Sequence, residues 1–236
     1  MRSEAEVGRV LADLFGAAPP RKVAQVAALL AEVEPRVAGG AREHVLVDVA
    51  CGKSYVLHAL AALARPRARY IGVDRAPQLI DQCRAAAARI GMAATFFTGE
   101  IAAAPLPERP DVLVALHACG AATDEAIAAA VRLRVRHALI APCCHLRPER
   151  AFASAMGLPP HGVLRGRLSD ALTDARRALQ LETAGFEVTA VEFVAATVTP
   201  HNLLLRARYV GPTGRAERAR DALARLAQLQ HVTTPG

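Results

Sequence analysis

Three acidic residues lie at the ends of three successive apolar runs, where their carboxylates could bind a ligand. Asp48 closes VLVD, Asp74 closes YIGVD and Glu100 follows TFFTG. The carboxyl ends of parallel strands meet at one edge of a sheet, where ligands bind. A carboxylate there can accept hydrogen bonds from ribose hydroxyls or a base amino group, or pair with a cation. The spacing therefore predicts a site for a nucleoside-like ligand, and the alternative is three ordinary loop acids.

The turn after Asp48 ends in Gly52-Lys53-Ser54, which also ends the loop that binds nucleoside triphosphates. That loop needs its first glycine at position 47, where this chain has valine. Asp48 would also repel a triphosphate. The small residues of the turn instead suit close backbone approach to a cofactor that carries an amino group and a sulfonium. Asp74 follows Gly52 by 22 residues, near the spacing at which a Rossmann-like site places its ribose-binding acid.

Alternating apolar and amphipathic stretches predict the elements that position these acids. The expected strands are Val45–Val49, Tyr70–Asp74, Thr95–Phe97, Asp111–Leu116, His137–Ala141, Glu187–Val194 and Asn202–Tyr209. The expected helices are Glu4–Phe15, Arg21–Val33, Ser54–Leu63, Pro77–Ile90, Thr123–Arg132, Ser169–Ala184 and Arg215–Gln230. The short, continuously apolar strands indicate a doubly wound α/β sheet covered on both faces, with the last two strands pairing antiparallel at one edge.

Composition sets the broad class. The chain has 236 residues, 53% of them hydrophobic, and no apolar run long enough to span a bilayer. MRSEAEVGRV is not typical of a signal peptide. Five cysteines, an odd number, disfavour a disulfide framework and favour a reduced, cytoplasmic setting.

The positive charge comes almost entirely from arginine. The net charge is +7, and residues 131–167 hold seven arginines and one acid. Such a run attracts phosphate groups, or else forms an ordinary solvated surface.

With these residues in place, the chain resembles the class I S-adenosylmethionine-dependent methyltransferases. VLVDVACGKSYVL resembles their first motif, D-x-G-x-G, with Ala50 in place of the first glycine. The resemblance implies a Rossmann-like seven-stranded methyltransferase sheet with helices on both faces and N-terminal accessory helices. It divides the chain into a helical extension (1–40), a methyltransferase domain (41–211) and a C-terminal helix (212–236). The cofactor-binding residues that it implies are Asp48, Ala50, Cys51, Gly52, Asp74, Arg75, Gly99, Glu100, Leu116 and His117.

Two later stretches resemble a narrower subgroup, which includes the acceptor-stem tRNA 2′-O-methyltransferases. LHACGAATD (116–124) follows the fourth strand and APCCHL (141–146) follows the fifth, and TPHNLLLRA (199–207) resembles the end of bacterial members. The subgroup indicates the chemistry more closely than the acceptor. We expect an S-adenosylmethionine-dependent methyltransferase acting on RNA; the alternatives are a small-metabolite acceptor or a non-catalytic cofactor-binding or RNA-binding module.

The histidines and cysteines of those stretches allow three interpretations. His117, His145 or Cys143 could act in catalysis, with a histidine accepting the proton of the nucleophile. Cysteine and histidine could bind zinc, although adjacent Cys143 and Cys144 are poor ligand spacing, so no metal is expected. They could also pack the pocket as small buried side chains.

A further polar set lies in the helix expected over 169–184. Asp170, Asp174 and Arg177 share one face at three- and four-residue spacing. They could touch the substrate or form surface ion pairs.

Overall fold

The computed structural model describes residues 2–39, 42–116, 118, 120–142, 158–159 and 161–232. Its strands are β1 (His44–Val49), β2 (Ala68–Asp74), β3 (Ala94–Thr98), β4 (Val112–Leu116), β5 (His137–Ala141), β6 (Phe186–Glu192) and β7 (Leu203–Tyr209). Its helices are α1 (Glu4–Phe15), α2 (Pro20–Val37), α3 (Tyr55–Leu63), α4 (Pro77–Arg89), α5 (Ala121–Leu133), α7 (Gly162–Thr183) and α8 (Gly214–Val232).

The strands form one sheet in the order β3-β2-β1-β4-β5-β7-β6. β1 to β5 are parallel, while β7 runs antiparallel to both β5 and β6. The predicted Rossmann-like sheet and its antiparallel terminal pair are therefore confirmed. The strand order reverses between β1 and β4, and such a reversal opens a crevice at the carboxyl edge of the sheet.

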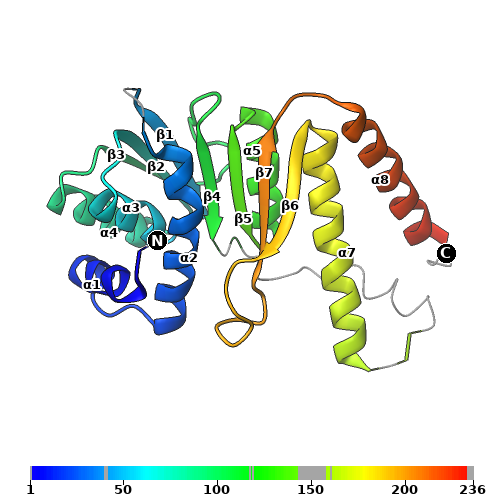
Figure 1. Ribbon diagram of the computed structural model, residues 1–236, viewed down its shortest axis with the longest axis horizontal. Helices are drawn as coiled ribbons and strands as arrows, with labels where there is room; N and C mark the ends of the chain where they lie inside the picture. Colours follow the sequence, from blue (N-terminus) through cyan, green and yellow to red (C-terminus); the bar gives the residue numbers. More distant parts are fainter. Residues whose placement is uncertain are drawn as a thin grey trace.

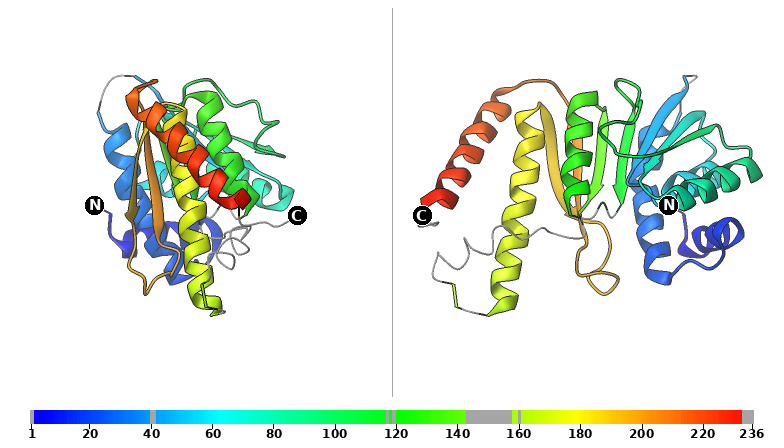
Figure 2. Two further views of the ribbon diagram at one scale, coloured as in Figure 1. Left: turned by 90° about the vertical axis from the view of Figure 1, so that its right-hand side faces the viewer. Right: turned by 180° about the vertical axis from the view of Figure 1, so that it is seen from behind.

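The central strands β1, β4 and β5 are almost continuously apolar because both of their faces are buried. Leu46 of β1 packs with α1, α2 and α3, whereas its neighbour Val47 packs with α5 on the opposite face. Figure 1 shows α2 in front of the sheet, and the view from behind in Figure 2 shows α5 and α7 over the other face. Two separate hydrophobic clusters thus cover the two faces of the sheet. The loops that follow the strands lie at its carboxyl edge.

Two helices extend beyond the predicted bounds by a full turn or more. α2 continues through Pro35 to Val37, and α7 begins at Gly162, two turns before the expected start. Gly162 and Gly166 are weak helix formers, and the exposed Val163 and Leu164 obscure the amphipathic pattern there. The first turns of α7 consequently extend past the carboxyl edge of the sheet, as does the loop between β6 and β7 (Figure 1).

No helix in the described residues combines the length and the apolar character needed to cross a bilayer.

Candidate functional site

The turn between β1 and α3 has an unusual backbone. Ala50, Gly52 and Ser54 all adopt positive φ angles, of 51°, 54° and 47°. The Cys51 amide donates to the Val73 carbonyl at 3.0 Å and so ties the turn to β2. A Cβ added at Gly52 would meet no atom within 4 Å. The backbone is therefore folded tightly, with open space on the side where a ligand would approach.

Asp48 is buried at the carboxyl end of β1, with 3% of its surface exposed. Its Oδ2 accepts a hydrogen bond from the Ser54 hydroxyl at 2.8 Å. Burial raises the pKa of this carboxyl to about 8, the neighbouring Asp74 charge adds to the rise, and the Ser54 hydrogen bond opposes it. Asp48 is therefore largely protonated at neutral pH, and a cation placed beside it would favour the ionised form.

Asp74 closes the same turn from β2. One carboxylate oxygen accepts the Gly52 amide at 2.7 Å and the other accepts the Ala76 amide at 2.9 Å. A carboxylate has about four acceptor sites, so each oxygen can still accept a hydroxyl of a ribose.

Glu100 lies just beyond β3 and is bound by Arg75. The Nη2 atom of Arg75 lies 2.5 Å from a Glu100 oxygen and 2.7 Å from an oxygen of Glu125, which is on α5. These contacts raise the pKa of Arg75, the Glu100 hydrogen bond most of all. All three side chains are partly exposed, so water screens the cluster.

A cavity of about 90 Å³ adjoins this ion-pair cluster. It is lined by Ala50, Val73, Asp74, Arg75, Gly99, Ile101, Ala122 and Glu125. Ligand pockets usually measure about 300 Å³ or more. The cavity is therefore smaller than a complete adenosyl cofactor needs, and the exposed Arg75 side chain forms part of its lining.

The structure brings most of the predicted cofactor residues together. Ala50, Asp74, Arg75 and Gly99 line the cavity, and Glu100 contacts Arg75 at its rim. Asp48 and Gly52 belong to the adjoining turn, and Leu116 ends β4. The sequence reasoning missed Val73, Ile101, Ala122 and Glu125. Glu125 could have been predicted, because it lies in the first turn of a helix that was expected to begin at this edge of the sheet.

Cys51 contributes its backbone to the turn after β1, whereas its side chain does not line the cavity. Its Sγ lies near the Gly72 backbone and Cys83. The contact with Cys83 and burial raise the pKa of the Cys51 thiol. The thiol therefore stays protonated and acts as a small packing group below the turn.

The residues predicted for catalysis, His117, Cys143 and His145, lie outside the described residues, as do Cys119 and Cys144. Within the described residues, no three His, Cys, Asp or Glu side chains gather in a way that could hold a metal.

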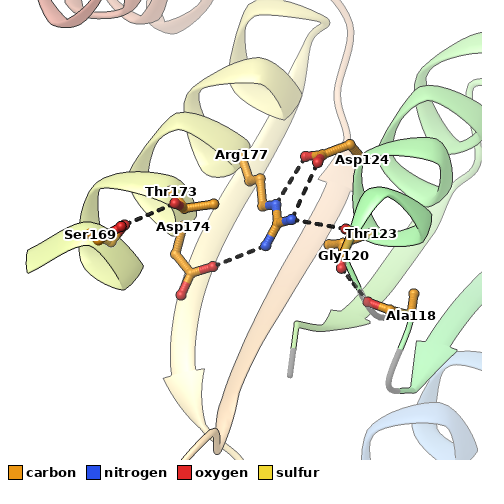
Figure 3. Close-up of polar contacts among 8 residues, drawn as sticks. All are labelled: Ala118, Gly120, Thr123, Asp124, Ser169, Thr173, Asp174 and Arg177. Carbon is orange, nitrogen blue, oxygen red and sulfur yellow. Dashed lines mark hydrogen bonds and ion pairs between the residues drawn. The ribbon is translucent and has the colours of Figure 1, made fainter. Parts of the chain in front are cut away.

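The ion pair expected between Arg177 and Asp174 is present, but the expectation that it lies at the surface was wrong. The Arg177 side chain is completely buried, and it contacts Asp124 on α5 and Asp174 on its own helix (Figure 3). It is therefore neither at the surface nor open to a substrate.

The arginine-rich run does not form one patch beside the site. Arg132, Arg134 and Arg136 lie at the end of α5 and before β5, where Arg136 contacts the segment preceding β4. They are therefore at the amino edge of the sheet, opposite the cavity. Arg165 and Arg167 lie in the first turns of α7, beyond the carboxyl edge.

Comparison with known proteins agrees with this geometry. A family model described as a methyltransferase domain matches residues 21–148, which is more than half of the chain. No curated protein matches the sequence.

Two solved structures share the fold at low identity. A dimethyladenosine transferase from Plasmodium falciparum has a TM-score of 0.50 and 13% identity, over 80% of this chain and 63% of that chain. A protein described as an S-adenosylmethionine-dependent methyltransferase from Methanococcus maripaludis has a TM-score of 0.52 and 10% identity, over 89% of this chain and 93% of that one. The present chain thus spans less than two thirds of the first of these two proteins.

Proposed function

The chain belongs to this family of methyltransferase domains, enzymes that use S-adenosylmethionine, and we propose that it transfers the cofactor's methyl group to RNA. The observation that carries the cofactor site is the pairing of Asp74 with the Gly52 turn, beside buried Asp48. This arrangement supports assigning the crevice at the carboxyl ends of β1, β2 and β3 to the cofactor.

The residues present fit such a cofactor by their chemistry. Asp48 would face the cationic amino group, Asp74 would accept the ribose hydroxyls and Glu100 would accept the adenine amino group. The Gly52 and Gly99 backbones, each with open space where a Cβ would lie, would allow close approach. When bound, the cofactor supplies an electrophilic methyl group on its sulfonium.

The protein's part in the transfer is mainly alignment. Holding the nucleophile in line with a reactive methyl group supplies a large share of the rate. His117 or His145 would accept the proton of the nucleophile, and Cys143 would lie beside them after β5. These assignments rest on the positions of HACGAATD and PCCHL just after two neighbouring parallel strands.

RNA as the acceptor is supported by charge and by motif. The net charge of +7 favours a polyanion. Arg167 is exposed on the part of α7 that projects past the carboxyl edge. The paired motifs 116–124 and 141–146 resemble those of acceptor-stem tRNA 2′-O-methyltransferases, which suggests a ribose hydroxyl as the nucleophile.

A small metabolite is the second candidate acceptor. It is favoured by the location of Arg132, Arg134 and Arg136 at the opposite edge of the sheet, where they cannot bind a phosphate near the cavity.

One experiment separates these functions. The protein is incubated with methyl-labelled cofactor and either fractionated cellular RNA or small-molecule extract, at low and moderate salt. Label in RNA that falls steeply with salt supports the RNA acceptor, because phosphate contacts release counterions. Label in the small-molecule fraction, with weak salt dependence, supports the metabolite. Cofactor binding without transfer to either fraction would contradict both acceptors and support a non-catalytic module.

A further inference from the structure

Arg177 forms a buried link between α7 and the start of α5 (Figure 3). Its Nε donates to one oxygen of Asp124 at 3.0 Å, and its Nη2 donates to the other at 3.3 Å. The same Nη2 donates to the Gly120 carbonyl at 3.3 Å, and Nη1 lies 3.6 Å from Asp174. None of the Arg177 side chain is exposed.

These contacts act on the loop between β4 and α5. The Arg177 guanidinium holds the Gly120 carbonyl, and the buried Thr123 hydroxyl donates to the Ala118 carbonyl. The two carbonyls flank position 119 in the sequence. Gly120 has φ 60° and ψ −124°, and α5 has no side-chain N-cap of its own. Among the described residues of this loop, Ala118 and Gly120 are held by bonds from outside it, and the bond from Arg177 comes from another helix.

The arrangement requires the geometry of an arginine. The planar guanidinium reaches both oxygens of Asp124 and a backbone carbonyl at once. A lysine ammonium is a point charge on a flexible stem and cannot bridge the same three acceptors in one plane. A lysine at position 177 would keep the charge but lose part of the link.

We propose that Arg177 is a positioning residue for methyl transfer. It holds the Gly120 carbonyl and Asp124 at the start of α5, and it joins them to α7. Because the first turns of α7 project past the carboxyl edge, where the acceptor enters, the link sets the relative position of the acceptor-side helix and the cofactor-side loop. This inference rests on the proposed function for its catalytic meaning, whereas the loop link stands on the contacts alone.

The test compares Arg177→Lys with Arg215→Lys. Arg215 also pairs with two carboxylates, Glu182 and Glu187, but it lies on α8, away from the loop. Hydrogen exchange of amides 118–124 is measured with and without S-adenosylhomocysteine, together with kcat, KM and cofactor affinity. For Arg177→Lys we expect loop exchange to rise and kcat to fall, each by about tenfold or more, as for a broken buried link. The cofactor Kd should change much less, and Arg215→Lys should change none of these values.

Asp124→Asn provides a second variant if Arg177→Lys does not fold. It weakens the paired contact and leaves the Gly120 bond, so loop exchange should rise less. Unchanged loop exchange in a folded variant would overturn the inference, and so would a full kcat in Arg177→Lys. Because hydrogen exchange needs no acceptor, failure of the loop link is distinguishable from failure of the proposed function, which would appear as no transfer by the wild type.

Discussion

Arg75 and Arg177 each lie between two carboxylates, but they occupy opposite environments. Arg75 joins Glu100 and Glu125 at the rim of the cavity, with 59% of its side chain exposed. Arg177 joins Asp124 and Asp174 between two helices, with none of its side chain exposed. Both groups touch α5, through Glu125 and Asp124, which are adjacent in the sequence.

Solvent exposure decides which of the two ion pairs can open. A solvent-exposed pair is screened by water and costs little to separate, so Arg75 can move when the cofactor enters. A buried guanidinium leaves uncompensated partners when its contacts break. The rim cluster is therefore suited to admit a ligand, and the buried cluster is suited to keep the loop after β4 in one place.

Replacing each arginine by methionine tests this contrast and has the largest expected effect. Arg177→Met should lower the free energy of unfolding by about 3–5 kcal/mol, because Asp174 and the Gly120 carbonyl lose a buried partner. Arg75→Met should leave the unfolding curve nearly unchanged. Urea titration followed by circular dichroism gives both values. Equal losses in the two variants would contradict the distinction.

The acids at the site also differ in exposure, because Asp48 is buried and Glu100 is exposed. The pKa of Asp48 is raised in the folded state, so the native protein holds a proton that the unfolded chain releases. The contribution of Asp48 to stability is therefore complete below about pH 4 and is lost as the pH rises through about 8. Ionisation also favours the cationic amino group, so affinity for S-adenosylhomocysteine should rise between pH 6 and pH 8.

Asp48→Asn separates these two effects. The amide can still accept from Ser54 but cannot ionise, so at pH 8 the variant should be more stable than the wild type. It should also bind S-adenosylhomocysteine about tenfold or more weakly, since a bond to a charged group is lost. Calorimetry and thermal unfolding across this pH range check both results. If variant and wild type show the same pH dependence, Asp48 is not the titrating group.

A smaller effect is expected at Ala50, which stands where the family's first motif has a glycine. Ala50 has φ 51°, a conformation that costs a residue with a Cβ about 1 kcal/mol. Ala50→Gly should therefore stabilise the protein by about 0.5–1 kcal/mol. Ala85→Gly, on the exposed side of α4, should destabilise it by about the same amount. The opposite signs are readable by urea unfolding, and a loss at position 50 would show that the turn is not strained.

The sequence predicted the sheet and the acid positions because local patterns determine both. Continuous apolar runs are typical of strands buried on two faces, and Asp48 and Asp74 lie at the ends of two such strands. Asp48 and Asp74 thus lie on either side of the β1 turn, and Glu100 contacts Arg75, the residue that follows Asp74.

The Arg177 contact could not be predicted in the same way. An arginine three residues after an aspartate in a helix is typical of a surface pair. What buries it is the packing of α7 on α5, a contact across 53 residues of sequence. The split of the arginine run has a similar cause, because β5 carries the chain from the amino edge of the sheet to its carboxyl edge between Arg136 and Arg165.

Calorimetric titration of S-adenosylhomocysteine into the wild type, Asp74→Ala and Asp81→Ala shows whether this crevice binds the methyl donor. Asp81 is an exposed carboxylate on α4, away from the cavity. The wild type and Asp81→Ala should bind with equal affinity, whereas Asp74→Ala should bind about tenfold or more weakly, through loss of charge-assisted hydrogen bonds. No binding by the wild type, or equal binding by all three proteins, would contradict the assignment of this crevice to the methyl donor.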